Sequence, residues 1–405
     1  EQDEAVGHAV RAGYMYSGMA DVAAITGDSS YVRAIDRIWE NIVGKKIYIT
    51  GGIGARHEGE AFGDNYELPN LTAYNETCAA IGNVYTNYRL FLLHGDAKYF
   101  DVLERTLYNG LISGVSLDGG RFFYPNPLAC DGKYRFNADH TITRQPWFGC
   151  ACCPSNISRF IPSLPGYVYA VKDDKVYVNL FLSNRTKLKV NGKNVVLEQE
   201  TSYPWNGDIR LTVAKGNQPF VMNVRIPGWV CGSVLPGGLY SYADGEELAY
   251  RVSVNGQEVK GALQKGYLSI DRRWKKGDVV EIHFDMQPRV VKANDKVAAD
   301  RGRVAIECGP LVYCAEWPDN DFDISTLLLN RHPKFQVVER PDLLGGINEI
   351  TTRAQALSYD ATGRLAAKDV KLTLIPYYAW AHRGEGRMEV WLPIEVGAAS
   401  AELQE

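Results

Sequence analysis

The sequence predicts a multidomain α and β protein, with a helical N-terminal part followed by β-sheet domains. Apolar residues recur with the 3.6-residue period of helices over about the first 165 positions. Beyond residue 167 they alternate with the two-residue period of strands, and Asn-Gly pairs typical of tight hairpins appear. A chain of 405 residues has room for several domains of roughly 150 residues each.

The clearest helical pattern lies in residues 79–93. Its apolar positions share one helical face: Ile81, Val84, Tyr85, Tyr88 and Leu92. The pair His94-Gly95 is a typical helix end, and two further helices are predicted over 9–24 and 30–43. Short connections between successive helices favour antiparallel neighbours, as in a helical bundle or an α/α barrel.

Strand signals begin with the alternation over residues 176–182. Four turn signals follow, of which the first three are hairpin-type pairs: Asn191-Gly192, Asn206-Gly207, Asn255-Gly256 and Gly277-Asp278. Strands at this spacing indicate β-sandwiches, and a break near 287–300 separates two of them. We therefore expect domains over residues 1–166, 167–290 and 291–405.

Composition and charge exclude several classes of protein. Apolar residues make up 45% and charged residues 23%, which is ordinary for a globular protein. The net charge of −4 argues against nucleic acid as a partner, because phosphate binding needs concentrated positive charge. The longest apolar run, at 90–93, is far too short for a membrane span. Serine-hydrolase, zincin and P-loop motifs do not occur.

Cysteines cluster unusually in the segment Gly149-Cys150-Ala151-Cys152-Cys153-Pro154. A bend favoured by Gly149 and Pro154 would let Cys152 and Cys153 converge on one ion. Asn75 is a good helix N-cap, which would place Glu76 and Cys78 in the first turn of the helix that follows. Three sulfurs and one carboxylate make a zinc ligand set. The alternative is that these cysteines are small buried apolar groups, and the residues alone leave both open.

Two carboxylates are candidate site residues for different reasons. Glu60 follows a glycine-rich loop and precedes Ala61-Phe62, and a carboxyl group beside apolar groups can serve as a general acid. An ordinary solvated loop glutamate is the alternative. Glu104 shares the apolar helical face of Phe100 and Leu107, so it either pairs with an arginine in the core or faces a polar ligand.

Aromatic and histidine side chains add further candidates. Tyr124 and Trp147 are candidate platforms for stacking against a sugar, although aromatic residues more often belong to the core. His8 is either a ligand or a hydrogen-bonded core histidine.

Together these motifs resemble glycoside hydrolase family 127, the β-L-arabinofuranosidases. The resemblance covers essentially the whole chain. It rests on seven segments of the helical part and two of the β part: Gly7-His8-Ala9-Val10-Arg11, Thr50-Gly51-Gly52-Ile53-Gly54, Gly59-Glu60-Ala61-Phe62, Glu67-Leu68-Pro69-Asn70, Glu76-Thr77-Cys78, Glu104-Arg105-Thr106-Leu107-Tyr108-Asn109, Cys152-Cys153-Pro154, Ile375-Pro376-Tyr377-Tyr378-Ala379-Trp380-Ala381 and Trp391-Leu392-Pro393.

The resemblance implies a fold, an activity and a set of site residues. The fold would be the C-terminal part of an (α/α)6 barrel followed by two β-sandwich domains. The activity would be retaining hydrolysis that releases L-arabinofuranose from β-linked glycans. Zn²⁺ would be held by Glu76, Cys78, Cys152 and Cys153. Cys152 would be the nucleophile, Glu60 the acid/base, and the sugar would contact His8, Glu104 and Tyr124.

The family pattern has a long helical portion before Gly7-His8, so we expect this chain to lack about half of the barrel. Two alternatives stay open: a zinc-stabilised carbohydrate-binding protein without catalysis, and a related hydrolase of another furanoside. The expected partner is an oligo- or polysaccharide. The sequence leaves open the oligomeric state, a homodimer included, and the choice between cytoplasm and periplasm, because exposed thiolates favour a reducing compartment whereas zinc would protect them.

Overall fold

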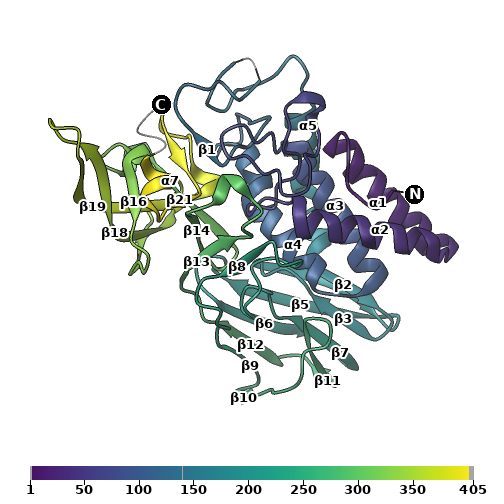
Figure 1. Cartoon of the computed structure of the whole chain (residues 1–405). Coiled ribbons are helices and arrows are strands. Elements are labelled where there is room, and N and C mark those ends of the chain that lie inside the picture. The colour runs from purple at the N-terminus through teal and green to yellow at the C-terminus, as the bar shows by residue number, and fades with distance from the viewer. Residues whose placement is uncertain (1, 139, 401–405) are drawn as a thin grey trace.

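The computed structural model describes residues 2–138 and 140–400, and places helices on one side of the molecule and β-sheets on the other (Figure 1). The helices are α1 (Ala9–Thr26), α2 (Ser29–Asn41), α3 (Thr77–His94), α4 (Lys98–Thr106), α5 (Cys152–Phe160), α6 (Pro165–Val168) and α7 (Val396–Ser400). Short helical turns are η1 (Ile42–Lys46), η2 (Glu58–Glu60), η3 (Leu107–Leu111), η4 (Ile112–Gly114), η5 (Ile161–Ser163), η6 (Ala298–Asp300), η7 (Trp317–Asp319), η8 (Ile324–Thr326) and η9 (Tyr377–Ala379).

Two sheets form the middle of the chain. One has the strand order β10-β9-β12-β6-β5-β4 and the other β11-β7-β3-β2, with β3 and β7 parallel. Their inward-facing side chains belong to one hydrophobic cluster, as the alternating burial of β5, β6 and β12 requires. The strands are β2 (Tyr169–Lys172), β3 (Lys175–Val178), β4 (Asn184–Val190), β5 (Lys193–Thr201), β6 (Asp208–Lys215), β7 (Asn217–Arg225), β9 (Tyr250–Val254), β10 (Gln257–Glu258), β11 (Tyr267–Lys275) and β12 (Val279–Phe284).

An 11-stranded sheet with the main order β16-β18-β19-β15-β14-β13-β8 forms the C-terminal part. Its strand β8 comes from the middle of the chain and β1 from the helical part, so this sheet joins all three regions. The strands are β1 (Ala129–Cys130), β8 (Tyr240–Tyr242), β13 (Pro288–Ala293), β14 (Arg303–Cys308), β15 (Leu311–Glu316), β16 (Leu327–Leu329), β17 (Gln336–Arg340), β18 (Ile347–Tyr359), β19 (Leu365–Pro376), β20 (Met388–Glu389) and β21 (Leu392–Pro393).

This arrangement confirms the predicted fold class of a helical part followed by β-sheet domains. The predicted helices over 9–24 and 79–93 correspond to α1 and α3, while the one over 30–43 ends as a helix at Asn41. The segment of the predicted break near 287–300 contains strand β13. That strand spans the predicted boundary at 290/291, and the three-domain division stays a prediction.

Two of the three predicted Asn-Gly hairpins are confirmed. Asn191-Gly192 joins β4 to β5 and Asn255-Gly256 joins β9 to β10, with all four φ angles between 48° and 78°. Asn206-Gly207 is not such a turn, since neither residue has a positive φ. A side chain at Gly207 would place its Cβ 1.9 Å from the carbonyl oxygen of Phe284, so close backbone approach explains this glycine.

Helix α4 is held to both β regions by buried charges. Arg225 of β7 pairs with Glu104 and also with Asp101, at 2.9 Å from Nη1 to Oδ1. On the other side Arg105 pairs with Glu307 of β14 at 2.6 Å. Charges this deep are tolerated only when paired, so these contacts fix how α4 lies against the sheets.

None of the helices within residues 2–138 and 140–400 combines the length and apolar character that crossing a membrane requires.

Arg225 is expected to be a strong stability determinant. Arg225→Met would leave the buried carboxylates of Glu104 and Asp101 without their cation, at a cost of about 3–5 kcal/mol. Arg210→Met is the matched control, because Arg210 lies on β6 in a half-exposed pair with Glu281 and should change stability by no more than about 0.5 kcal/mol. Urea unfolding monitored by circular dichroism compares the two, and equal midpoints would contradict a structural role for the Arg225 pairs.

Candidate active site

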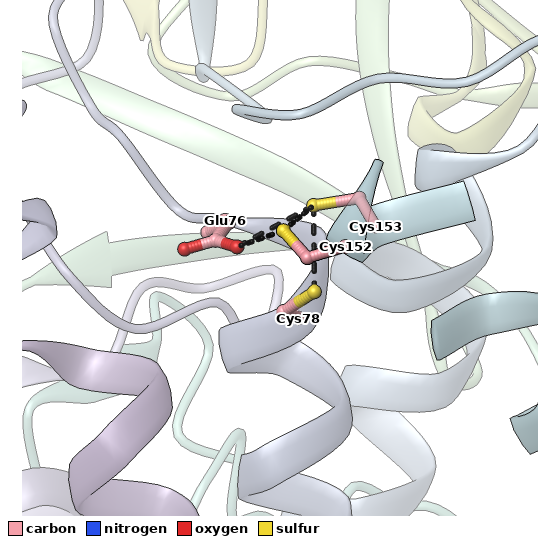
Figure 2. Close-up of side chains that lie close together, drawn as sticks. All are labelled: Glu76, Cys78, Cys152 and Cys153. Carbon is pink, nitrogen blue, oxygen red and sulfur yellow. Dashed lines mark hydrogen bonds between the residues drawn. The ribbon is translucent and has the colours of Figure 1, made fainter. Parts of the chain in front are cut away.

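Three helix N-termini meet at one place in the helical part. His8 is the N-cap of α1, Glu76 is the N-cap of α3, and Cys152 is the first residue of α5. Figure 2 shows Glu76 and Cys78 facing Cys152 and Cys153, which come from α5. Because the start of a helix carries partial positive charge, all three helices favour anionic groups at this point.

The four side chains have the spacing of a metal ligand set. The sulfur of Cys153 lies 3.5 Å from that of Cys78 and 3.8 Å from that of Cys152. Glu76 Oε1 lies 3.4 Å from the sulfurs of both Cys152 and Cys153. Ligands ~2.3 Å from a tetrahedral ion lie ~3.8 Å from one another. All four ligand atoms lie within 4.8 Å of one another, so this group could hold a metal ion.

The local sequence explains this convergence, with one correction. Pro154 is the third residue of α5, a position in the first turn where proline has no hydrogen bond to lose. Cys152 and Cys153 therefore converge as neighbours at a helix start. The prediction that Asn75 caps α3 is wrong: Asn75 has a φ of 42° and precedes the cap, Glu76. Cys78 nevertheless lies in the first turn, as expected.

Burial and mutual repulsion shift the pKa values of this cluster. Burial, followed by the nearby charge of Cys152, raises the pKa of Glu76 to about 9. Hydrogen bonds from Cys153 and Cys78 lower the pKa of Cys152, whereas burial raises that of Cys153. The protein thus favours a thiolate at Cys152 and opposes charge on its neighbours. A cation would relieve that opposition.

A second set of polar residues adjoins the cluster. His8 Nε2 lies 2.8 Å from Glu60 Oε2, and the Tyr74 hydroxyl donates to Glu60 Oε1 at 3.0 Å. The backbone N–H of Arg11 donates to His8 Nδ1 in a long contact of 3.5 Å, which assigns the ring proton to Nε2, facing Glu60. His8 and Glu60 are partly exposed, at 21% and 34%. This pair therefore has access to solvent beside a buried ligand cluster.

Glycine 51 lets the loop that carries Glu60 pack against α4. Gly51 has a φ of 78°, and a Cβ there would lie 2.5 Å from the Cα of Thr106. The loop continues into η2, where Glu60 itself has a φ of 50°. The chain therefore lies directly against α4 at Gly51, nine residues before Glu60.

The aromatic candidates lie in different surroundings. The Tyr124 hydroxyl lies 2.8 Å from the Cys152 sulfur, and its ring is close to those of Tyr74 and Phe148. Trp147 is 61% exposed, so it is not a core residue. Sequence reasoning missed Tyr74, the neighbour of Asn75, whose hydroxyl holds Glu60. The sequence signal that could have identified Tyr74 is its position directly before the Asn-Glu-Thr-Cys segment.

Glu104 does not join the other predicted site residues. Its carboxylate is buried, pairs with Arg225 and accepts a hydrogen bond from Tyr203 at 2.9 Å. The alternative weighed for it, an arginine partner in the core, is the contact that the structure shows. The sugar contact of Glu104 stays a prediction; the residue is 1% exposed, and both of these partners come from the β region.

The sequence matches three family profiles in succession. They are described as the GH127 catalytic domain of β-L-arabinofuranosidase at residues 1–166, the GH127 middle domain at 175–286, and the C-terminal domain of glycoside hydrolase family 127 at 288–393. The chain belongs to glycoside hydrolase family 127, which confirms the resemblance drawn from the motifs.

Individual relatives agree with this assignment. A curated protein of Bifidobacterium longum subsp. longum, named non-reducing end β-L-arabinofuranosidase, is 36% identical over 96% of this chain and 60% of its own length. A solved structure titled as a GH127 β-arabinofuranosidase is 75% identical with a TM-score of 0.95, over 98% of this chain and 61% of that one. A GH127 β-L-arabinofuranosidase from Geobacillus stearothermophilus T6 is 41% identical with a TM-score of 0.89, over 97% and 61%. The chain spans about three fifths of these relatives.

Metal binding at the cluster is directly testable. Cys78→Ser replaces one sulfur ligand by a hydroxyl, so we expect the purified variant to lose most of its bound metal. Cys314→Ser is the control, because Cys314 is equally buried but lies on β15, outside the cluster. Inductively coupled plasma mass spectrometry measures metal per chain. Equal metal content in both variants would contradict the ligand assignment.

Proposed function

We propose that this chain forms the active site of a retaining β-L-arabinofuranosidase in which Cys152 is the nucleophile and Glu60 the acid/base. The carrying observation is the exposure of the sulfurs: Cys78 and Cys153 are buried, whereas Cys152 is partly exposed. A nucleophile must reach the substrate, and Cys152 alone among the three cluster sulfurs can do so. The relatives named as β-L-arabinofuranosidases support the choice of sugar.

Zinc is the cation that this ligand set fits best. Thiolates select soft or borderline ions, and three sulfurs with one carboxylate suit a four-coordinate Zn²⁺ site. Glu76 Oε1, 3.4 Å from the sulfurs of both Cys152 and Cys153, is the carboxylate oxygen of that set. When bound, Zn²⁺ would keep Glu76, Cys78, Cys152 and Cys153 deprotonated, and so supply a stable thiolate.

In the first step the Cys152 sulfur forms a bond to the anomeric carbon of the furanoside. The bond between that carbon and the leaving oxygen breaks, and Glu60 gives its proton to that oxygen. His8 and Tyr74 orient the Glu60 carboxyl group through its two oxygens. The Tyr124 hydroxyl, 2.8 Å from the sulfur, steadies the thiolate before attack.

In the second step Glu60, now a carboxylate, takes a proton from water. The water oxygen bonds to the anomeric carbon, and the Cys152 thiolate leaves. Two displacements at one carbon give net retention of configuration. The tyrosines around Cys152 and Glu60 provide an amphipathic wall against which a furanose ring can lie.

Cys152→Ser tests the nucleophile. A serine hydroxyl is not ionised at neutral pH, so hydrolysis of an aryl β-L-arabinofuranoside should fall by at least about 10³-fold. Activity is measured on the purified protein.

Cys231→Ser is the matched control for this variant, because Cys231 is also partly exposed but belongs to the middle β region. We expect it to hydrolyse at the parent rate. Full turnover by Cys152→Ser would refute the nucleophile assignment.

Glu60→Gln tests the acid/base. Loss of a general acid costs roughly 10²–10⁴-fold, and the loss should be largest for alkyl leaving groups, which need the proton most. Glu58→Gln, in the same turn η2, is exposed and should be neutral. The test is to measure kcat/KM of the parent and both variants on aryl and alkyl substrates.

Unchanged hydrolysis of both substrates by Glu60→Gln would refute the acid/base assignment. A parent protein that binds glycan and metal but hydrolyses neither substrate would instead favour a second candidate function. That candidate is a zinc-stabilised carbohydrate-binding protein, which would bind glycan and metal without turnover.

A further inference from the structure

A second group of ligand atoms adjoins the thiolate cluster. His8, Glu60 and Glu76 each offer one nitrogen or oxygen atom, and these atoms lie within 4.8 Å of one another. Only Glu76 belongs to both groups. The proposed hydrolysis uses Glu60 for proton transfer and His8 to orient it, and leaves the cation-binding capacity of this second group unexplained.

Glu76 has an oxygen available for this group. Its Oε1 faces the sulfurs of Cys152 and Cys153, while its Oε2 is buried and has no hydrogen-bond partner among the described residues. Figure 2 shows that second oxygen on the side away from the sulfurs. The residue is only 2% exposed, so water does not readily replace the missing partner.

The side chains of His8 and Glu60 already face one another across a single proton. The Nε2 proton lies between a nitrogen and an oxygen that are 2.8 Å apart. A divalent cation in place of that proton would meet the same two atoms after a small widening. The ring proton would then move to Nδ1, which gives up only the long contact of 3.5 Å with Arg11.

We propose that His8, Glu60 and Glu76 form a second zinc-binding site, with Glu76 bridging it to the thiolate cluster. One imidazole and two carboxylates are ligands that Zn²⁺ accepts, and the imidazole disfavours Mg²⁺ and Ca²⁺. Charge supports the assignment, because three thiolates and a carboxylate exceed the charge of a single divalent ion, and Glu60 adds a further negative charge.

Occupancy of this site would switch hydrolysis off. A cation bound to Glu60 occupies the oxygen that must carry the proton to the leaving group and later take one from water. Excess zinc is therefore an inhibitor that competes with protons for the acid/base, at a position next to the nucleophile. This consequence rests on the proposed function, whereas the binding itself does not.

Equilibrium dialysis against Zn²⁺, without substrate, tests the site on the natural full-length protein. We expect the parent to bind a second equivalent of zinc after the thiolate cluster is filled. Glu60→Gln and His8→Asn should weaken that second equivalent by more than the roughly 10–100-fold that losing an outer-shell partner costs. Asparagine is itself a good N-cap, so His8→Asn preserves the start of α1.

His57→Asn is the matched control, because His57 is exposed and packs on Tyr74 without belonging to the ligand group. It should bind zinc like the parent. A parent that saturates at one equivalent, or a second equivalent that survives in both ligand variants, would overturn the proposal.

Cobalt substitution provides an independent readout. Co²⁺ bound to thiolates has an intense sulfur-to-metal charge-transfer band, whereas Co²⁺ at a nitrogen and oxygen site does not. The second equivalent of Co²⁺ should add visible d–d absorption without a matching gain in charge transfer, and this signal should vanish in His8→Asn. Because neither experiment measures turnover, an active Cys152→Ser variant would refute the proposed function and leave this site standing.

Discussion

The structure of this site depends on electrostatic crowding at the meeting of three helix N-termini. Three sulfurs and a carboxylate lie at ligand spacing in a largely buried place. The helix starts offset part of the negative charge, but four anions cannot coexist there without protons or a cation. Since Cys78 and Cys153 lie far apart in the chain, a bound ion would also act as a cross-link between α3 and α5.

The β regions brace the helices that carry this cluster. Arg225 and Glu307, from different sheets, clamp the adjacent Glu104 and Arg105 of α4, and α4 packs on α3 through Phe100 and Phe91. Because buried ion pairs tolerate little change in geometry, they fix α4 relative to the sheets, and α4 in turn packs against the C-terminal end of α3. The sheets thus brace α4, and through it the helix whose first turn carries Cys78.

Periodicity predicted α1, α3 and the alternation of the strands because each reflects a local burial pattern. The preference of Asn-Gly pairs for tight hairpins correctly predicted the turn at Asn191-Gly192. It failed at Asn206-Gly207, where the backbone of Phe284 lies so close to Gly207 that tertiary packing explains the glycine. The same limit applies to the site. Residue types and spacing pointed to the four side chains that could hold a metal ion, whereas the contact between Tyr74 and Glu60 depends on how two loop segments pack together, which no local pattern encodes.

The surroundings of Glu104 and Glu60 show that residue type alone does not determine the role of a carboxylate. Both are carboxylates in motifs of the same family resemblance, yet one is neutralised by Arg225 in the core and the other is partly exposed beside Cys152. A group that exchanges protons needs access to substrate and a partner that does not bind it permanently. His8 and Tyr74 each contact Glu60 through one oxygen and leave the group partly exposed, whereas Arg225 and Tyr203 enclose the carboxylate of Glu104 in the core. This difference in partners, and not the residue type, separates a structural carboxylate from one that can carry a proton.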